Sequence, residues 1–236
     1  MDYLHFFEPV DYLVVGHVTH DVQPDNSLKL GGTVSFSGLT ALALGQRVGV
    51  VTSCNPQTDL SHLAHTAVVC QSADQTTTFQ NVSSPEGRKQ FLYEKAGVLN
   101  STSIPEVWRS TPIVHLGPVA SEIDPEIHRA FPDSMLCLTA QGWLRGVDGE
   151  QRVHPIAWPF DHELLKAAHA VVISQEDVRG HEGLIDEFAA MCRLLVVTEN
   201  SQGALVYWNG DIHRFPAPAV PLVEDTGADR KSTRLN

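Results

Sequence analysis

One group of residues near the N-terminus has the types and spacing needed to hold a ligand rich in hydroxyl groups. Asp21 follows an apolar run that ends at Gly16, and Gly31 and Gly32 come ten residues later. An ionised aspartate accepts two hydrogen bonds from neighbouring hydroxyls, and glycine lets backbone amides approach a ligand closely. We expect Asp21, Gly31 and Gly32 to line one end of a cleft. The alternatives are a turn aspartate that bonds its own backbone, and a tight glycine turn before a helix.

Motifs for several other chemistries are absent from the sequence. There is no Gly-x-Gly-x-x-Gly after the first apolar run, no Gly-x-x-x-x-Gly-Lys-Ser/Thr and no Gly-x-Ser-x-Gly. A dinucleotide fingerprint, a P-loop and a hydrolase elbow are therefore not supported. The closest histidine pairs, His17/His20 and His62/His65, have no matching carboxylate or thiol cluster near them, so we expect no structural zinc.

The composition favours an acidic, globular α/β protein. The 236 residues carry a net charge of −12, which argues against binding to nucleic acid or to an anionic membrane. Backbone amides can still hold the phosphates of a nucleotide. The four cysteines form no Cys-x-x-Cys pair, and no apolar stretch reaches the length of a membrane span. We expect a reduced, cytoplasmic protein.

Short apolar runs alternate with helical patterns, which is typical of a parallel sheet. We predict strands at 12–16, 47–52, 112–117, 135–139, 170–174 and 194–198, helices at 36–44, 161–168 and 184–191, and a hairpin closed by Asn209 and Gly210. Residues 75–96 are rich in β-formers and predict a hairpin outside the sheet, and 23–27 predict a turn between two exposed strands. We interpret segments 18–32 and 75–96 as a small β lid on one domain. The alternatives for the hairpin are an ordinary exposed hairpin and the contact of a homodimer.

Four features in this order resemble the ribokinase-like (PfkB) carbohydrate kinases. They are Gly16 with Asp21 before Gly31-Gly32, the hairpin at 77–94, the run 196–198 followed by 203–206, and Asp225-Thr226-Gly227-Ala228. The stretches Leu30-Gly31-Gly32-x-x-Ser35-Phe36, Gly117-Pro118-Val119 and Gln141-Gly142-x-x-Arg145 also look like the myo-inositol kinase branch. The resemblance implies a three-layer, doubly wound, mostly parallel sheet.

The resemblance also implies site residues. It implies that the sugar or polyol is bound by Asp21, Gly31, Gly32 and Gln141. It implies that ATP is bound by Thr198, Gly203, Thr226, Gly227 and Ala228, and that Mg²⁺ is bound at Asp177. Asp177 would orient magnesium-bound water; otherwise it is a carboxylate at a helix N-terminus. The chain departs from the family pattern at Phe36, Thr139, Ser174 and Asn200.

The last eight residues do not match a protein pattern. Residues 229–236 have no apolar periodicity, and the string is what a common sequencing adapter encodes. We interpret it as a non-native tail that follows a C-terminally truncated kinase domain over 1–228. The resemblance places a catalytic aspartate after Gly-Ala-Gly, whereas Asp229 follows Ala228 directly, so no catalytic base is assigned and we expect this fragment to be inactive.

The resemblance thus implies that the parent protein transfers a phosphoryl group from ATP to a hydroxyl of a small sugar or polyol. The alternative is a non-catalytic sugar- or nucleoside-binding protein on the same scaffold.

Overall fold

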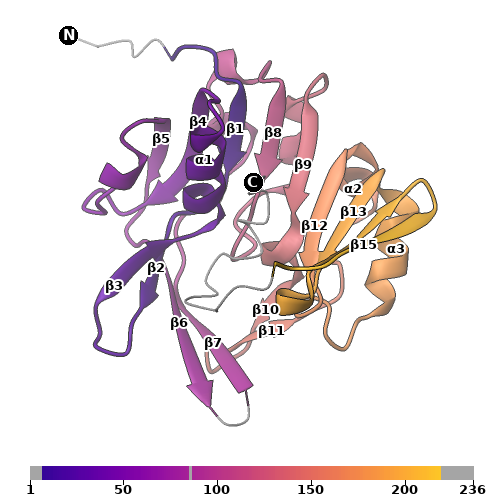
Figure 1. Cartoon of the computed structure of the whole chain (residues 1–236). Helices are drawn as coiled ribbons and strands as arrows, with labels where there is room; N and C mark the ends of the chain where they lie inside the picture. The colour runs from indigo at the N-terminus through magenta and orange to yellow at the C-terminus, as the bar shows by residue number, and fades with distance from the viewer. Residues whose placement is uncertain (1–6, 85–86, 219–236) are drawn as a thin grey trace.

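The computed structural model describes residues 7–84 and 87–218, and its centre is a nine-stranded sheet (Figure 1). The strand order is β15-β14-β13-β12-β9-β8-β1-β4-β5. Neighbours from β13 to β5 pair in parallel, and β14 and β15 are antiparallel. The strands are β1 (Tyr12–Val15), β4 (Val48–Cys54), β5 (Ala67–Ser72), β8 (Ile113–Leu116), β9 (Met135–Thr139), β12 (Ala170–Ser174), β13 (Leu194–Thr198), β14 (Ala204–Trp208) and β15 (Asp211–Phe215).

Alternate residues of the central strands enter two separate cores, because successive side chains of a strand point to opposite faces. Leu13 and Val15 of β1 belong to the larger core, and Val14 belongs to the smaller one. The smaller core contains Val34 of helix α1 (Thr33–Ala43). Both faces of β1 are therefore buried, as expected for a central parallel strand.

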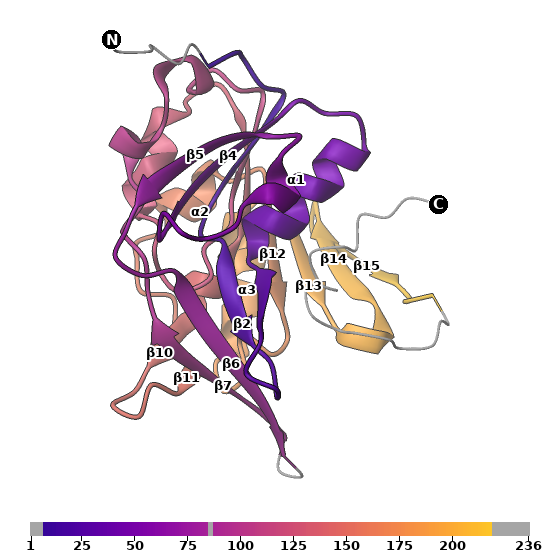
Figure 2. The same cartoon turned by 90° about the vertical axis from the view of Figure 1, so that its left-hand side faces the viewer.

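The helices lie on both faces of the sheet (Figure 2). Helix α1 packs against β1 and β4, whereas α2 (Glu163–Ala167) and α3 (Gly183–Met191) pack on the opposite face with the larger core. That face also carries four 3-10 helices: η2 (Ser101–Ser103), η3 (Glu106–Trp108), η4 (Pro125–Ala130) and η5 (Ala140–Leu144). The 3-10 helix η1 (Ser61–Leu63) borders the smaller core, and η6 (Asn200–Gln202) follows β13. The α/β class and the three layers are confirmed.

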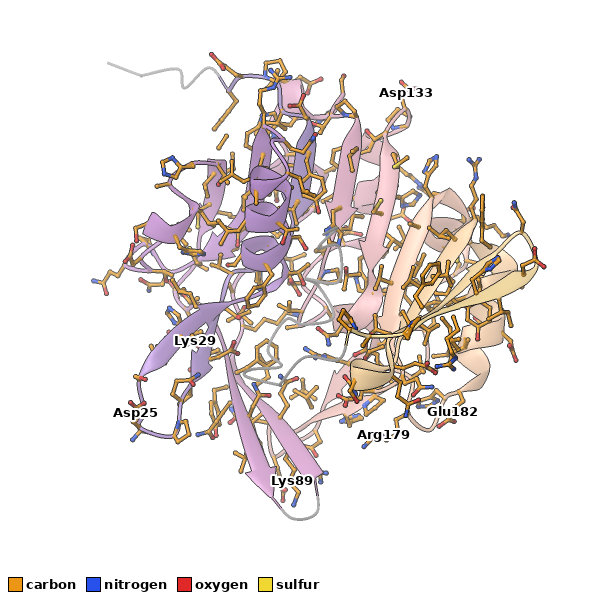
Figure 3. All side chains as sticks on the ribbon, in the orientation of Figure 1. Asp25, Lys29, Lys89, Asp133, Arg179 and Glu182 are labelled. Atoms are coloured by element: carbon orange, nitrogen blue, oxygen red, sulfur yellow. The ribbon has the colours of Figure 1, made fainter. Side chains whose placement is uncertain are left out.

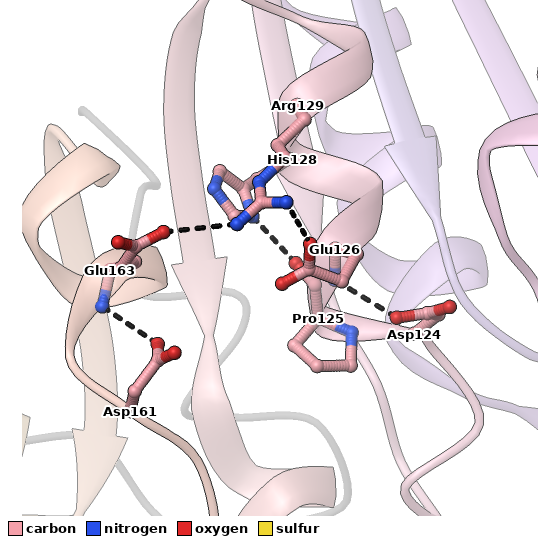
Figure 4. A network of polar contacts seen from close by, with 7 residues as sticks. All are labelled: Asp124, Pro125, Glu126, His128, Arg129, Asp161 and Glu163. Carbon is pink, nitrogen blue, oxygen red and sulfur yellow. Dashed lines mark hydrogen bonds and ion pairs between the residues drawn. The ribbon is translucent and has the colours of Figure 1, made fainter.

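Arg129 of η4 pairs with Glu126 of the same turn and with Glu163 of α2 (Figure 4). The Arg129 guanidinium lies 2.5 Å from Glu126 Oε2 and 3.0 Å from Glu163 Oε2. Asp124 and Asp161 each accept a backbone N–H at the start of their segments. All three charged side chains of the Arg129 network are exposed, so these contacts add only about 0–1 kcal/mol each.

A second, four-stranded sheet extends beyond the carboxyl ends of the central strands (Figure 1). Its order is β3-β2-β6-β7, with β2 (Thr19–Val22), β3 (Leu28–Gly31), β6 (Thr77–Ser84) and β7 (Gly87–Glu94). The predicted hairpin and the predicted turn at 23–27 are both confirmed. A short pair, β10 (Arg145–Val147) and β11 (Val153–Pro155), joins β7 through a bridge between Phe91 and Arg152.

The strand order of the central sheet reverses between β1 and β8. From β1 the chain proceeds to β4 and β5 on one side, and it then returns to β8 on the other side of β1. Ligands of doubly wound sheets bind outside the carboxyl ends of the strands at such a switch point. The residues that follow Val15 and Leu116 are therefore the expected ligand-binding residues.

Among the helices of residues 7–84 and 87–218, none has the length and apolar character needed to cross a bilayer.

Candidate functional site

Backbone hydrogen bonds join the carboxyl end of β1 to β8 and to β4 at the switch point. Gly117 N–H donates to Val15 O over 2.9 Å, and Gly16 N–H donates to Val51 O over 3.0 Å. A β-carbon at Gly16 would lie 2.5 Å from Gly117 O, so a larger residue at this position would push the two strand ends apart. The chain leaving β1 then enters β2, which carries Asp21.

The Asp21 carboxylate lies directly against Gly31 at the start of the second sheet. A β-carbon at Gly31 would lie 2.5 Å from Asp21 Oδ2 and 2.9 Å from Thr19 Oγ1. Asp21 and Thr19 point to the same side of β2 because they are two residues apart. The missing side chain of Gly31 thus leaves the space that the carboxylate occupies.

Gly32 precedes α1 with a backbone that other residues rarely adopt. Its φ is +91°, and a β-carbon would collide with the backbone oxygen of His17. This packing gives a structural reason for the glycine pair that the sequence did not reveal: Gly31 accommodates Asp21, and Gly32 accommodates His17. The approach of a ligand to their amides stays a prediction.

His17 links the end of β1 to the second sheet and to the chain that leaves it. Its Nδ1 lies 2.6 Å from Thr77 Oγ1 of β6, and its Nε2 lies 2.8 Å from Gly97 O. A carbonyl oxygen can only accept, so Nε2 carries a proton. Thr77 Oγ1 also accepts from Ala96 N–H over 3.0 Å. The buried imidazole therefore holds both connections of the hairpin to the central sheet.

Glu122 is the buried carboxylate behind this junction, and sequence reasoning missed it. It is fully buried, and its oxygens accept backbone N–H bonds from His17 (3.0 Å), Val119 (2.9 Å) and Ala120 (2.7 Å). A buried anion needs such donors, since an unpartnered one is costly. The available signal was a single charged residue between the apolar residues Val119, Ala120 and Ile123.

Gln141 and Asp177, which were predicted to serve different ligands, are in contact. Gln141 Nε2 donates to Asp177 Oδ1 over 3.2 Å, and Ser174 N–H donates to Asp177 Oδ2 over 2.8 Å. Asp177 N–H in turn donates to Ser174 Oγ over 3.2 Å. Asp177 is buried and belongs to the turn that follows β12. Among the residues that the structure describes, no group of three or more His, Cys, Asp or Glu side chains is arranged to hold a metal ion.

Thr139, which stands where the resemblance leads us to expect an aspartate, is engaged within the sheet. Its Oγ1 lies 2.8 Å from His115 Nε2, and His115 Nδ1 lies 2.7 Å from the Tyr12 hydroxyl. Burial raises the pKa of Tyr12 well above its usual range, so the phenol is protonated and is available as the donor. This polar chain crosses β1, β8 and β9.

Thr198, Asn200 and Gly203 form the turn between β13 and β14. Thr198 is buried at the end of β13, and its hydroxyl lies 3.4 Å from Ile173 O. Asn200 has a φ of +51°, a left-handed conformation that asparagine adopts more readily than most residues. Gly203 has a φ of +102°, and a β-carbon there would collide with Phe215 O. The packing of β15 therefore requires this glycine.

Glu199 organises the polar groups around the same turn. The buried carboxylate accepts from Arg214 at 2.6 Å and from Gln175 Nε2 at 3.0 Å. Since Arg214 is half exposed, the pair is partly solvated. Asn200 Nδ2 also donates to Glu176 Oε1 over 3.1 Å, which joins this turn to the one after β12.

A depression of about 370 Å³ opens beside these two turns. Its lining includes Gln175, Glu176, Arg179, Glu182 and Asn200. Figure 3 shows Arg179 and Glu182 on the side of the molecule that carries α3. Three strand intervals separate β1 from β12, which corresponds to about 14 Å at the usual spacing. Asp21 and the depression therefore lie near the same edge of the sheet but at separate places. Thr226, Gly227, Ala228 and Asp229 lie outside the described residues.

Comparison with known proteins gives one consistent fold. No family model matches the chain. A pyrophosphate-dependent kinase in the ribokinase family superposes with a TM-score of 0.76 at 21% identity, covering 93% of this chain and 83% of that one. Ribokinase from Arabidopsis thaliana, complexed with ribose and ATP, superposes with a TM-score of 0.65 at 14% identity, covering 95% and 83%.

A curated fructokinase from Escherichia coli is 27% identical over 145 residues, which is 55% of this chain. The match spans about half of the fructokinase, 46% of its length. The predicted resemblance to ribokinase-family kinases is therefore confirmed at the level of the fold.

Proposed function

We propose that the protein transfers a phosphoryl group from ATP to a hydroxyl of a small sugar or polyol. The observation that supports this most directly is the Asp21 carboxylate, held against Gly31 beside the β1–β8 switch point of a ribokinase fold. Because the match covers about half of the fructokinase, the reaction is proposed for the whole protein.

The acceptor is proposed to bind at the Asp21 end. A carboxylate whose two oxygens accept from adjacent hydroxyls selects a polyol over a molecule with one hydroxyl. Gly31 and Gly32 supply backbone groups there, and Gln141 contributes from the end of β9. The relatives act on or bind such molecules: one pyrophosphate-dependent kinase is complexed with myo-inositol, and another neighbour is complexed with ribose.

The donor is proposed to lie toward the ends of β12 and β13. Thr198 and Gly203 flank the turn beside the depression, and Arg179 supplies a cation to its wall. Mg²⁺ would neutralise charge on the phosphates, and Asp177 would accept a hydrogen bond from a magnesium-bound water. Thr226, Gly227 and Ala228 are proposed to complete the phosphate site. The second sheet would exclude water from the transfer.

Binding measurements test the acceptor site without requiring turnover. We expect myo-inositol, fructose or ribose to bind the chain in calorimetry, and Asp21→Asn to weaken that affinity at least tenfold because one charged acceptor is lost. Asp25→Asn, on the exposed hairpin of the second sheet, is the matched control and should bind normally. Equal affinity of the Asp21→Asn variant and the wild type would remove the proposed role of Asp21.

The donor needs its own experiment, since several structural neighbours are pyrophosphate-dependent. Binding of ATP and of pyrophosphate, each with and without Mg²⁺, should be compared on wild type and Arg179→Gln. Tighter binding of pyrophosphate than ATP would reassign the donor but keep the reaction class.

A non-catalytic sugar- or nucleoside-binding protein is the second candidate. It is favoured by the polar groups at the donor end, where Glu199 pairs with Arg214 and Asp177 pairs with Gln141. Sugar binding without binding of either donor would support this candidate.

A further inference from the structure

Two cysteines meet at the edge of the central sheet, on the neighbouring strands β4 and β5. Cys54 ends β4 and Cys70 lies in β5, and their Sγ atoms are 2.7 Å apart. Both are free thiols. The strands pair Cys54 with Ser72 and Thr52 with Cys70, so the two thiols are diagonal neighbours on one face. The sulfurs need to approach by only about 0.7 Å to reach the ~2.05 Å of a disulfide bond.

The two thiols differ in access to solvent. Cys54 is 1% exposed and packs in the smaller core, whereas Cys70 is exposed. Strand β5 is the last strand on its side of the sheet, and among the strands of residues 7–84 and 87–218 it pairs with β4 only. An edge strand can shift more readily than a central one, because only one ladder holds it. A reagent from solvent therefore meets Cys70 first, and Cys54 lies directly behind it.

The contact between the two Sγ atoms also makes Cys70 the better nucleophile of the two. A hydrogen bond from Cys54 lowers the pKa of Cys70 to about 7, and the same contact together with burial raises the pKa of Cys54 far above its usual range. The thiolate is the reactive form of cysteine, and attack is fastest for a thiol whose pKa lies near the ambient pH. Cys70 has this property at neutral pH.

We propose that Cys54 and Cys70 form a thiol–disulfide exchange site for small-molecule disulfides, with Cys70 as the attacking thiol and Cys54 as the resolving thiol. The Cys70 thiolate attacks one sulfur of the small disulfide, and the other sulfur leaves as a thiolate that takes a proton from water. The Cys54 thiol then loses its proton to water and attacks Cys70 Sγ. The bond between Cys70 Sγ and the small thiol's sulfur breaks, and the second small thiolate leaves and takes up a proton from water. The two protein thiols are oxidised to one disulfide, and the small disulfide is reduced to two thiols.

The other two cysteines provide an internal comparison. Cys137 and Cys192 are half-buried, and burial raises the pKa of both thiols, that of Cys192 to about 11. Cys192 Sγ donates to Phe188 O over 2.9 Å. Neither has the exposed, activated character of Cys70, so both should react slowly.

The experiment incubates the chain with oxidised glutathione at neutral pH, blocks free thiols by alkylation, and maps the peptides by mass spectrometry. With alkylation carried out in denaturant, where all four thiols of the untreated chain react, we expect the wild type to lose two of its four alkylatable thiols and to yield a peptide pair that joins Cys54 to Cys70. Dithiothreitol should restore both. Cys54→Ser should stop after the first step and retain glutathione on Cys70. Cys192→Ser is the matched control and should still form the bond.

Three outcomes would overturn the proposal. They are a wild type that keeps both thiols alkylatable, a wild type that carries stable glutathione on Cys70 without the internal bond, and a joined peptide that links two copies of the chain. Since Cys54 is buried, Cys70→Ser at the exposed position provides a second variant with little risk to folding. It should form no bond at Cys54. The experiment measures the modification of thiols and not phosphoryl transfer, so its result does not depend on the proposed kinase activity.

Discussion

The side-chain amide of Gln141 donates a hydrogen bond to the Asp177 carboxylate, with Nε2 3.2 Å from Oδ1. The two residues are 36 positions apart in the sequence, and they meet because β9 and β12 are neighbours in the sheet. The contact joins the end of the strand proposed to bind the acceptor with the turn proposed to orient magnesium. A substitution of either residue should therefore alter both acceptor binding and donor binding at the proposed site.

Replacing Gln141 by Leu should destabilise the protein. The buried Asp177 carboxylate would lose one donor, and leaving a buried polar group without its partner costs about 1–3 kcal/mol. Urea unfolding measures the change. Gln57→Leu, at an exposed position, is the control and should unfold like the wild type. Equal stability of the two variants would show that the Gln141–Asp177 bond contributes nothing to folding.

Gly32→Ala should be strongly destabilising. The φ of +91° costs about 1–3 kcal/mol for a residue with a side chain, and the β-carbon would also collide with His17 O. Gly149→Ala is the matched control, because no atom lies within 4 Å of a β-carbon there. Thermal unfolding of the two variants gives the comparison. A melting temperature of Gly32→Ala equal to that of Gly149→Ala would contradict the packing described here.

Glu122→Gln should loosen the switch point. The amide keeps the shape of the side chain but turns one acceptor into a donor that faces backbone N–H groups. We expect a loss of about 1–3 kcal/mol in the free energy of unfolding. Exposed Glu150→Gln supplies the control. Faster hydrogen exchange at the amides of His17 and Ala120 would locate the effect, whereas unchanged exchange there would argue against it.

The reactivity of Cys70 should depend on pH in a defined way. The hydrogen bond from Cys54 lowers its pKa to about 7, so the rate of alkylation should rise through neutral pH and level off above it. In Cys54→Ala the donor is lost, the pKa returns toward that of an ordinary thiol, and the midpoint should move to higher pH. Iodoacetamide kinetics followed by mass spectrometry measure both profiles. Identical midpoints would show that Cys54 does not activate Cys70.

Local pattern predicted most of the elements. Six central strands, helices α1, α2 and α3 and the hairpins β2–β3, β6–β7 and β14–β15 lie where apolar periodicity and turn residues indicated. These signals are local, since each depends on residues within one strand, helix or turn. Strand β5 and the pair β10–β11 were missed: β5 is an edge strand with no buried residue, and β10 and β11 have three residues each, too few to show a periodic pattern.

The sequence by itself determined which residue types were available for chemistry, including Asp21, the glycine pair and the turn after β13. Only the tertiary structure decided their partners. His17 and Glu122 are 105 residues apart, His17 and Thr77 are 60 apart, and Cys54 and Cys70 are joined through the register of two strands. Such contacts are set by sheet order and by packing against both faces of the sheet, and no periodicity within one element encodes them.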